Sequence, residues 1–172
     1  MVQLASDEKT SSIMAYTQDS LILADLVTKQ GIRINTWLRT DAAPEFIHLV
    51  NARILTLVSA LKTSEFTEFF LPTDLLIGYH LTPPQHEPLD YDEGEQNRVM
   101  LPMTVLMGFM VLRCHVRTST RTDFSASLEA SRSAWMSVYN ASVSSPDLPQ
   151  MPVMQVPMML LRPNRVSYAL EA

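Results

Sequence analysis

Apolar and polar residues alternate along much of this chain with a period of two. In the segment 31–40, GIRINTWLRT, the apolar residues Ile32 and Leu38 would point to one side of a strand, whereas Trp37 and Arg39 would point to the other. Such strands bury one face and expose the other, as in antiparallel sheets. Enrichment in β-branched and aromatic residues predicts further strands. These are LVNARILTLV, EFTEFFL and LLIGYHL in the first half, and PMTVLMGFMVLRCHVRTS, SAWMSVYNASVS, MPVMQVPMMLL and RVSYAL in the second.

Few segments favour a helix. The clearest is TDFSASLEASRSAW, in which Thr122 or Asp123 could cap the first turn. A second short helix is indicated near Ser11–Tyr16, and SLILADLVTKQG is interpreted as a strand that leads into a turn. Pro152 and Pro157 cannot donate the backbone hydrogen bond of a central strand, so MPVMQVPMM is predicted to be an edge strand or to be broken by bulges.

One pattern occurs twice along the chain. The segments QGIRINTWLRT and MGFMVLRCHVRT contain a glycine, Gly31 or Gly108, then an alternating apolar stretch, and end in Arg-Thr. An Asp and a Phe follow in both copies, and an Asn-Ala pair then lies in a strand-like segment, at Asn51 and Asn140. A proline-led segment closes each copy, LPTDLLIGYHL or VPMMLLRPNRVSYAL. Matches in the same order predict an internal duplication with loop insertions, and two runs of similar strand composition are the alternative.

Composition divides the chain into four parts. An N-terminal segment (1–19) precedes a first β-repeat (20–81), and an acidic, proline-rich linker (82–98) separates it from a second β-repeat (99–172). Each repeat is too small for a generous core of its own, so the two are expected to pack together. The predicted fold is mainly β: two tandem copies of a small five-strand antiparallel barrel or sandwich unit, with one or two short helices and pseudo-twofold symmetry.

The overall composition is that of a globular protein. The chain has 172 residues, of which 47% are hydrophobic and 18% charged, and its net charge of -5 gives no general attraction to nucleic acid. No apolar run reaches the ~18 residues of a membrane span, and the N-terminus lacks the basic region of a signal peptide. We therefore expect a soluble cytoplasmic protein. Methionines cluster at 100–110 and 151–159, and they are interpreted as adaptable core residues, with a partner surface as the alternative.

The sequence contains no recognisable catalytic motif. Cys114, the only cysteine, would point away from Arg113 and His115 on a strand, so we expect a buried, unreactive thiol. The histidines are too far apart to form a local metal-binding pair, and four glycines provide no phosphate-binding loop. DYDEG in the linker lacks the spacing of a calcium loop, so the linker acids are interpreted as solvated, and Glu65 and Glu68 as the charged edge of a strand. We predict no catalytic residue, no metal and no cofactor.

Arginine and aromatic residues mark one candidate binding face. Arg113, His115 and Arg117 alternate along LRCHVRT and would share one side of a strand, and Trp37 and Arg39 take comparable places in the first copy. Such a face could stack bases and contact phosphates, and arginine, which accounts for most of the basic residues, suits planar contacts. An exposed strand face with cross-strand ion pairs is the alternative.

The pattern G-x-x-x-x-x-W-L-R-T, followed by F-x-x-L-x-N-A and a closing strand, resembles small β-domains of unknown function found in bacteria. The strand order that this resemblance implies is similar to that of Sm-like small barrels. The resemblance covers most of each copy, and the residues that carry it, Gly31, Asn51, Gly108 and Asn140, are markers of a fold. The long RNA-binding signatures of Sm proteins are not visible, so no RNA-binding residue is implied at any position.

Three functions remain open at this point. The main hypothesis is a non-enzymatic binding or assembly protein built on a duplicated β-domain, with a protein partner or self-association and no membrane. The first alternative is a single-stranded nucleic-acid binder that uses Trp37, Arg39, Arg113, His115 and Arg117. The second is a small-molecule sensor or enzyme with a pocket between the repeats.

Overall fold

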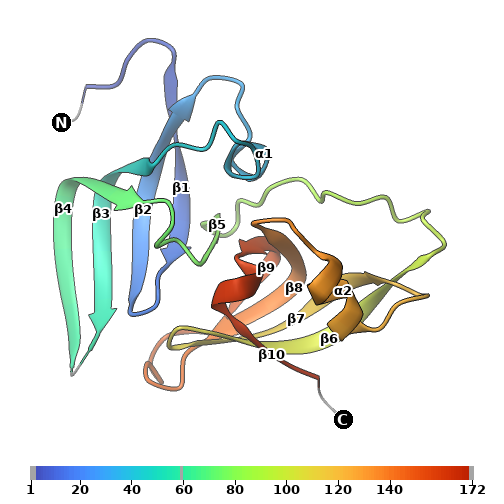
Figure 1. Ribbon diagram of the computed structural model, residues 1–172. Coiled ribbons are helices and arrows are strands. Elements are labelled where there is room, and N and C mark those ends of the chain that lie inside the picture. Colours follow the sequence, from blue (N-terminus) through green and yellow to red (C-terminus); the bar gives the residue numbers. More distant parts are fainter. Residues whose placement is uncertain (1–2, 59, 171–172) are drawn as a thin grey trace.

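The computed structural model describes residues 3–58 and 60–170, and it consists mainly of β-strands, as predicted (Figure 1). The elements in chain order are β1 (Glu8–Tyr16), β2 (Ser20–Lys29), α1 (Ile34–Leu38), β3 (Phe46–Leu57), β4 (Leu61–Pro72), β5 (Gly78–Leu81), β6 (Arg98–Met107), β7 (Met110–Ser119), α2 (Phe124–Ala130), β8 (Met136–Ser144), β9 (Met154–Leu161), the 3₁₀ turn η1 (Pro163–Arg165) and β10 (Ser167–Ala169).

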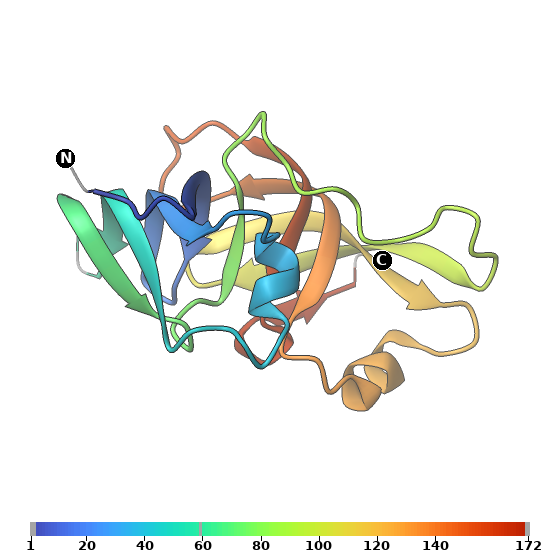
Figure 2. The same cartoon turned by 90° about the horizontal axis from the view of Figure 1, so that it is seen from above.

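These strands form one antiparallel sheet with the order β10-β6-β7-β8-β9-β5-β1-β2-β3-β4. The sheet is open, with β10 at one edge and β4 at the other, so of the two predicted alternatives, barrel or sandwich, a closed barrel is not formed. Figures 1 and 2 show two curved halves that meet where β5 runs beside β9. We call β1–β5 with α1 the first half, and β6–β10 with α2 the second half.

A short ladder between β5 and β9 joins the two halves. Gly78 and Tyr79 of β5 pair with Leu161 and Leu160 of β9. A Cβ atom on Gly78 would lie 2.6 Å from the sulfur of Met107, closer than any normal contact. Glycine therefore allows the close approach of the strands at this joint.

Arg162, directly after β9, reinforces the joint with three hydrogen bonds. Its backbone N–H donates to the Ile77 carbonyl at 2.8 Å, and its guanidinium donates to the carbonyls of Leu76 and Thr73, both at 2.8 Å. The guanidinium also lies 4.6 Å from the centroid of the Trp135 ring. Backbone carbonyls that would be left unpaired at the joint are satisfied in this way.

Each half contributes side chains to the core of the other. The core of the second half contains Tyr16 and Leu21, from β1 and β2, together with Ile77. The core beneath α1 in the first half contains Trp135 and Leu160 of the second half. Burial of these apolar side chains stabilises the two halves jointly.

The segment 31–40 is a turn followed by α1, so the prediction of a strand there is wrong. Gly31 has a φ of 76° and lies in the turn that follows β2. Ile34 and Leu38 are four residues apart, and one turn of helix brings both to the buried side. Alternation in a strand and the four-residue spacing of a helix coincide at these two positions, which explains why the period of two was misleading.

One further expectation is wrong, and two are confirmed. Ser11–Tyr16 is strand, because its apolar run lies between β2 and β5 in the middle of the sheet. The part of MPVMQVPMM that lies in β9, including Pro157, pairs with β8 alone, as predicted for an edge strand, and β5 pairs only with the last two residues of β9. The predicted helix is α2: the Asp123 carboxylate caps it by accepting a hydrogen bond from the Ala126 N–H at 2.7 Å.

Asn51 in β3 and Asn140 in β8 lie at β-bulges. Both have positive φ angles, 53° and 49°, a conformation that asparagine tolerates better than most residues. At each bulge, two residues of the strand face one residue of its neighbour, which is Ala24 in β2 or Cys114 in β7. The two bulges thus lie at corresponding places in the two halves.

Candidate functional site

The five residues predicted to form a binding face do not share one. Arg113, His115 and Arg117 alternate along β7 as predicted, but Trp37 lies in α1 and Arg39 directly follows it. The expectation of equivalent strand positions in the two copies is therefore wrong for these residues. The structure brings Arg39 and Arg117 to one common element, which is the linker between β5 and β6.

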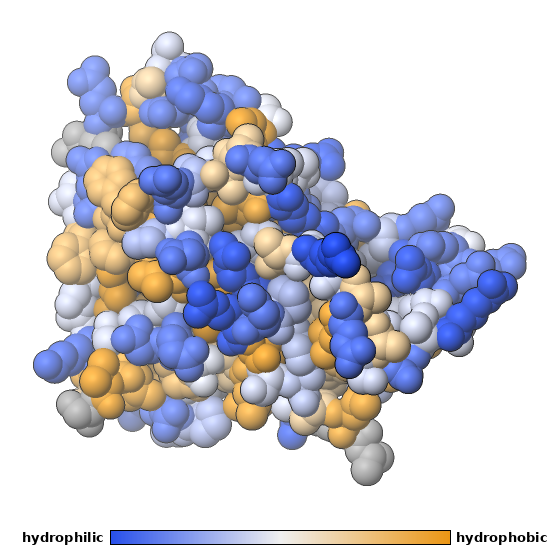
Figure 3. All heavy atoms as spheres, in the orientation of Figure 1, coloured by the Kyte–Doolittle hydropathy of each residue, from blue (hydrophilic) through white to orange (hydrophobic). Residues whose placement is uncertain are grey.

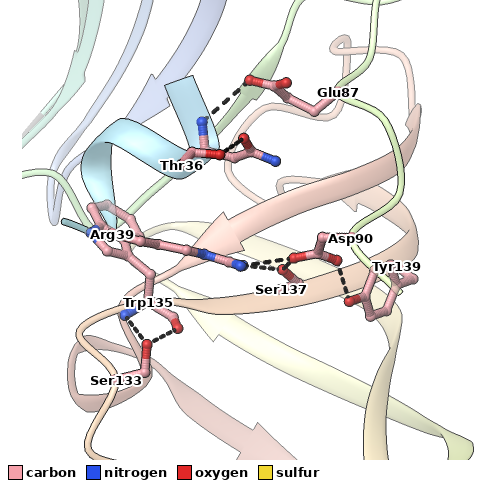
Figure 4. Close-up of polar contacts among 9 residues, drawn as sticks. Thr36, Arg39, Glu87, Asp90, Ser133, Trp135, Ser137 and Tyr139 are labelled. Atoms are coloured by element: carbon pink, nitrogen blue, oxygen red, sulfur yellow. Dashed lines mark hydrogen bonds and ion pairs between the residues drawn. The ribbon is translucent and has the colours of Figure 1, made fainter. Parts of the chain in front are cut away.

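Arg39 meets the linker at Asp90 (Figure 4). A guanidinium nitrogen of Arg39 lies 2.9 Å from the Asp90 carboxylate. Ser137 and Tyr139 of β8 donate hydroxyl hydrogen bonds to the same carboxylate, each at 2.6 Å, and Arg39 also donates to the Ser137 hydroxyl. The segment after α1, the linker and β8 therefore converge on one carboxylate.

The surroundings of Asp90 favour its ionised form. Burial alone would raise the pKa of Asp90, but the hydrogen bonds from Ser137 and Tyr139 and the charge of Arg39 together hold that pKa below its usual range. The interpretation of the linker acids as solvated is wrong here, since the Asp90 side chain is only 19% exposed. It is also wrong for Glu87, which is buried and accepts a hydrogen bond from a backbone N–H of α1.

Arg117 holds the following part of the linker. Its guanidinium lies 2.9 Å from the Glu95 carboxylate and donates to the Asp92 carbonyl at 2.6 Å. It also lies over the Tyr91 ring, 4.7 Å from the centroid, in the geometry of a cation–π contact. We call the contacts of the two arginines with linker residues 90–95 the linker clamp.

The linker clamp binds the chain to itself and offers no activated nucleophile. The Ser137 hydroxyl donates to Asp90, but the hydrogen bonds and the charge of Arg39 that lower the pKa of Asp90 make this carboxylate a weak base for taking the Ser137 proton. Burial raises the pKa of the Cys114 thiol to about 12, and this thiol is buried as predicted. Within residues 3–58 and 60–170, no three His, Cys, Asp or Glu side chains are grouped to hold a metal ion.

Sequence reasoning missed the centre of the clamp. Asp90 is one of five acids in the linker, and nothing in their order marks the one that reaches Ser137, 47 residues away. Ser137 and Tyr139 are two residues apart on β8 and so lie on one face of the strand. Two hydroxyl groups on one face indicate that a common hydrogen-bond acceptor lies nearby. The sequence alone does not identify that partner.

Strand β4 leaves a long edge of the sheet unpaired. Most of its residues are exposed, among them Phe66 at 46% and Phe70 at 56%. Figure 3 shows apolar side chains along this side of the molecule. Glu65 and Glu68 lie on this edge strand and contact side chains of β3: Glu65 forms an ion pair with Arg53, and a Glu68 carboxylate oxygen lies 3.0 Å from Nε2 of His48. Exposed ion pairs of this kind contribute little to stability, so they do not account for the exposed aromatic residues.

A cavity of about 430 Å³ lies beside β4, lined by residues of the first half and by Arg165 of the second half. It opens near the turn between β1 and β2, and both polar and apolar groups line it. Its apolar wall consists of Ile22, Ile54, Phe69, Leu71, Leu75 and Ile77.

Comparison with known proteins found no matching family model, no matching curated protein and no matching solved structure. Neither helix found in the described part of the chain has the length and apolar character that crossing a membrane requires.

Proposed function

We propose that this is a non-enzymatic assembly protein, built from a duplicated five-strand β-unit, whose open β4 end binds another protein chain. The contrast between two surfaces carries the proposal. Arg39 and Arg117 are engaged in the linker clamp, whereas the β4 edge leaves backbone groups and aromatic side chains uncovered. An uncovered strand edge is a template on which a further strand can pair.

The pairing of the strands supports the duplication. The orders β5-β1-β2-β3-β4 and β10-β6-β7-β8-β9 are the same, and the helix follows the second strand in both. When Asn51 is matched with Asn140, corresponding ladder positions in all five strands lie 89 or 90 residues apart. Gly31 and Gly108 do not correspond in this register, because Gly31 follows β2 and Gly108 lies between β6 and β7. The Asn-Ala pairs do correspond.

The nucleic-acid alternative has less support, since Arg39 and Arg117 already face carboxylates of the linker.

One feature favours the small-molecule alternative: an apolar groove of about 480 Å³ near the joint, between β3 and the segment that leads into β9. A thermal-shift screen with small metabolites tests it, because a ligand that binds the folded protein raises the Tm. The groove is lined in part by Leu23, Leu55, Met151, Pro152 and Met154.

Sedimentation velocity at protein concentrations from about 1 to about 200 µM tests the assembly proposal. We expect the average mass of the wild-type protein to rise above the 19.4 kDa of one chain. The double variant Phe66→Lys/Phe70→Lys should remain a single chain, and a matched double variant at exposed residues elsewhere, Leu89→Lys/Val153→Lys, should assemble like wild type. Circular dichroism checks that each variant is folded. A monomeric wild type, or assembly that persists without the β4 aromatics, would contradict the proposal.

A further inference from the structure

The internal joint between β5 and β9 has an open counterpart at each end of the sheet. In the duplicated register, β9 corresponds to β4 and β5 corresponds to β10, and β4 and β10 are the two free edges. We infer that the β10 end of one copy docks on the β4 end of the next copy, so that copies assemble head to tail through the same kind of contact that joins the two halves. This inference rests on the proposed function and names the partner as a second copy of this chain.

At the internal joint, the first half inserts apolar side chains into the second half. The inserted residues, each at most 3% exposed, are Tyr16, Leu21 and Ile77. Their counterparts in the second half are Leu106, Val111 and Val166. Within the described residues no other strand unit covers these counterparts: Leu106 is 49% exposed and the other two are half-buried. The β10 end thus presents the same kind of surface, uncovered.

The β4 end shows the complementary feature. In the second half, the residues around the inserted side chains are all at most 1% exposed: Leu112, Val143, Met159 and Leu161. Their counterparts in the first half, of which Phe69 is partly buried and the others are at most 8% exposed, line the cavity of about 430 Å³ together with Arg165 of the second half: Ile22, Ile54, Phe69 and Leu71. In the second half, the place that corresponds to this cavity is occupied by Tyr16 of the first half. Leu106 is the counterpart of Tyr16, so Leu106 of the next copy would enter the cavity.

The internal joint also specifies the register between copies. Transferring it to the free ends places Ser167 of one copy opposite Leu71 of the next copy, and Tyr168 opposite Phe70. Tyr79 is the counterpart of Tyr168 and is only 1% exposed at the internal joint. The exposed Phe70 would gain an aromatic neighbour across the strands, an arrangement that stabilises sheets.

The contact between copies lacks the hydrogen bonds that Arg162 makes at the internal joint. Arg162 provides three hydrogen bonds there, but its counterpart is Pro72, which has neither a backbone N–H nor a guanidinium. We therefore expect reversible, concentration-dependent assembly. Because the contact joins two different surfaces, it produces rings or filaments and no twofold dimer.

Single substitutions at the two ends test the inference by sedimentation. Phe70→Lys blocks the β4 end and Leu106→Lys blocks the β10 end, and each should weaken assembly at least about tenfold. Both residues are about half exposed, so the fold should persist, as circular dichroism and thermal melting can verify. Leu61→Lys and Val99→Lys are matched controls, exposed residues of the same strands β4 and β6 but outside the contact, and they should assemble like wild type.

Mixing the two blocked variants distinguishes head-to-tail assembly from a twofold contact. The Phe70→Lys chain keeps its β10 end and the Leu106→Lys chain keeps its β4 end, so an equimolar mixture should form complexes of two chains that grow no further. If Leu106→Lys alone assembles like wild type while Phe70→Lys does not, the β4 end remains a binding surface and the head-to-tail inference is overturned. A wild type that stays monomeric over the whole concentration range overturns both proposals.

Discussion

His80 shows how completely a single buried side chain can be set by its surroundings. Its Nε2 accepts a hydrogen bond from the Tyr16 hydroxyl at 2.8 Å, and its Nδ1–H donates to the Leu81 carbonyl at 2.7 Å. Burial lowers the pKa of His80 to about 4, although the bond to Leu81 opposes this shift. The ring is therefore neutral at physiological pH, with both nitrogens satisfied.

Acid should destabilise the fold through His80. Its pKa is about 4 in the folded state and 6.5 as the ordinary value, so the unfolded state binds the proton more tightly. The contribution of the neutral His80 ring to the free energy of unfolding is fully present above about pH 6.5 and is lost as the pH falls toward 4. We expect this group to reduce the free energy of unfolding by about 2 kcal/mol between about pH 7.5 and pH 5. Urea titrations of wild type and His80→Gln measure the effect, and equal pH dependence in both proteins would argue against it.

The two bulge asparagines should respond differently to alanine and glycine. Asn51→Ala and Asn140→Ala should each cost about 1 kcal/mol, because a Cβ atom disfavours positive φ when no amide side chain compensates. Glycine at either position relieves this strain, so Asn51→Gly and Asn140→Gly should be the more stable member of each pair. Chemical denaturation gives the comparison. Glycine variants less stable than their alanine partners would show that strain at positive φ does not determine the cost of the alanine substitutions.

At the scale of elements, the linker lacks regular structure and is held by side-chain contacts at a few residues, Asp90 among them. Asp90→Ala should destabilise the protein by about 2 kcal/mol, because Ser137, Tyr139 and Arg39 lose a common acceptor. Proteolysis within the linker should be faster in this variant. Glu93→Ala, an exposed residue of the same linker, serves as the control. Equal stability and cleavage rates in the two variants would mean that the linker clamp is not formed in solution.

Local patterns in the sequence predicted many elements but not their partners. Alternation and β-propensity predicted the strands that contain Asn51 and Asn140, which are β3 and β8. The cap at Asp123 predicted α2. The segment 31–40 was ambiguous, because its buried residues satisfy the periods of both strand and helix. The linker clamp and the β5·β9 joint depend on contacts between residues far apart in sequence, for which alternation contains no information. The sequence therefore marked Arg39 and Arg117 as candidate site residues, but it did not predict the linker residues that they contact.

Gly78→Ala tests how closely the halves must approach. The new methyl group would lie 2.6 Å from the Met107 sulfur and 3.3 Å from the Leu160 carbonyl, and this backbone atom cannot move aside easily. We expect a loss of about 1–3 kcal/mol by denaturation. Gly94→Ala, in the exposed part of the linker, should cost much less. Equal losses would indicate that β5 and β9 separate readily.

At the scale of the whole molecule, the sheet has two unlike edges. Strand β10 has three residues and β4 has twelve, so one edge is short and the other offers a long row of unpaired groups. Two unlike ends define a direction, and each copy can bind one neighbour at each end. The exposed aromatic residues of β4 fit this directional contact better than they fit an isolated molecule.

Salt should have little effect on the assembly, because the proposed contact joins apolar groups such as Phe70 and Leu106. Raising NaCl from about 0.1 to about 0.5 M should change the Kd for self-association by less than about threefold. A steep weakening of self-association with salt would point instead to ion pairs.

Binding of a labelled oligonucleotide that weakens with salt in the same range, and is lost in Arg117→Ala, would favour the nucleic-acid alternative.

The order of the strands also has a consequence for folding on the ribosome. Tyr16 precedes Met159 of β9 by 143 residues, yet both residues belong to one core. Contacts between such distant parts of a chain form slowly, because the long intervening segment must first be closed into a loop. The second half can complete its core only when Tyr16, Leu21 and Ile77 of the first half are in place. Until these contacts form, the chain should be most dependent on chaperones.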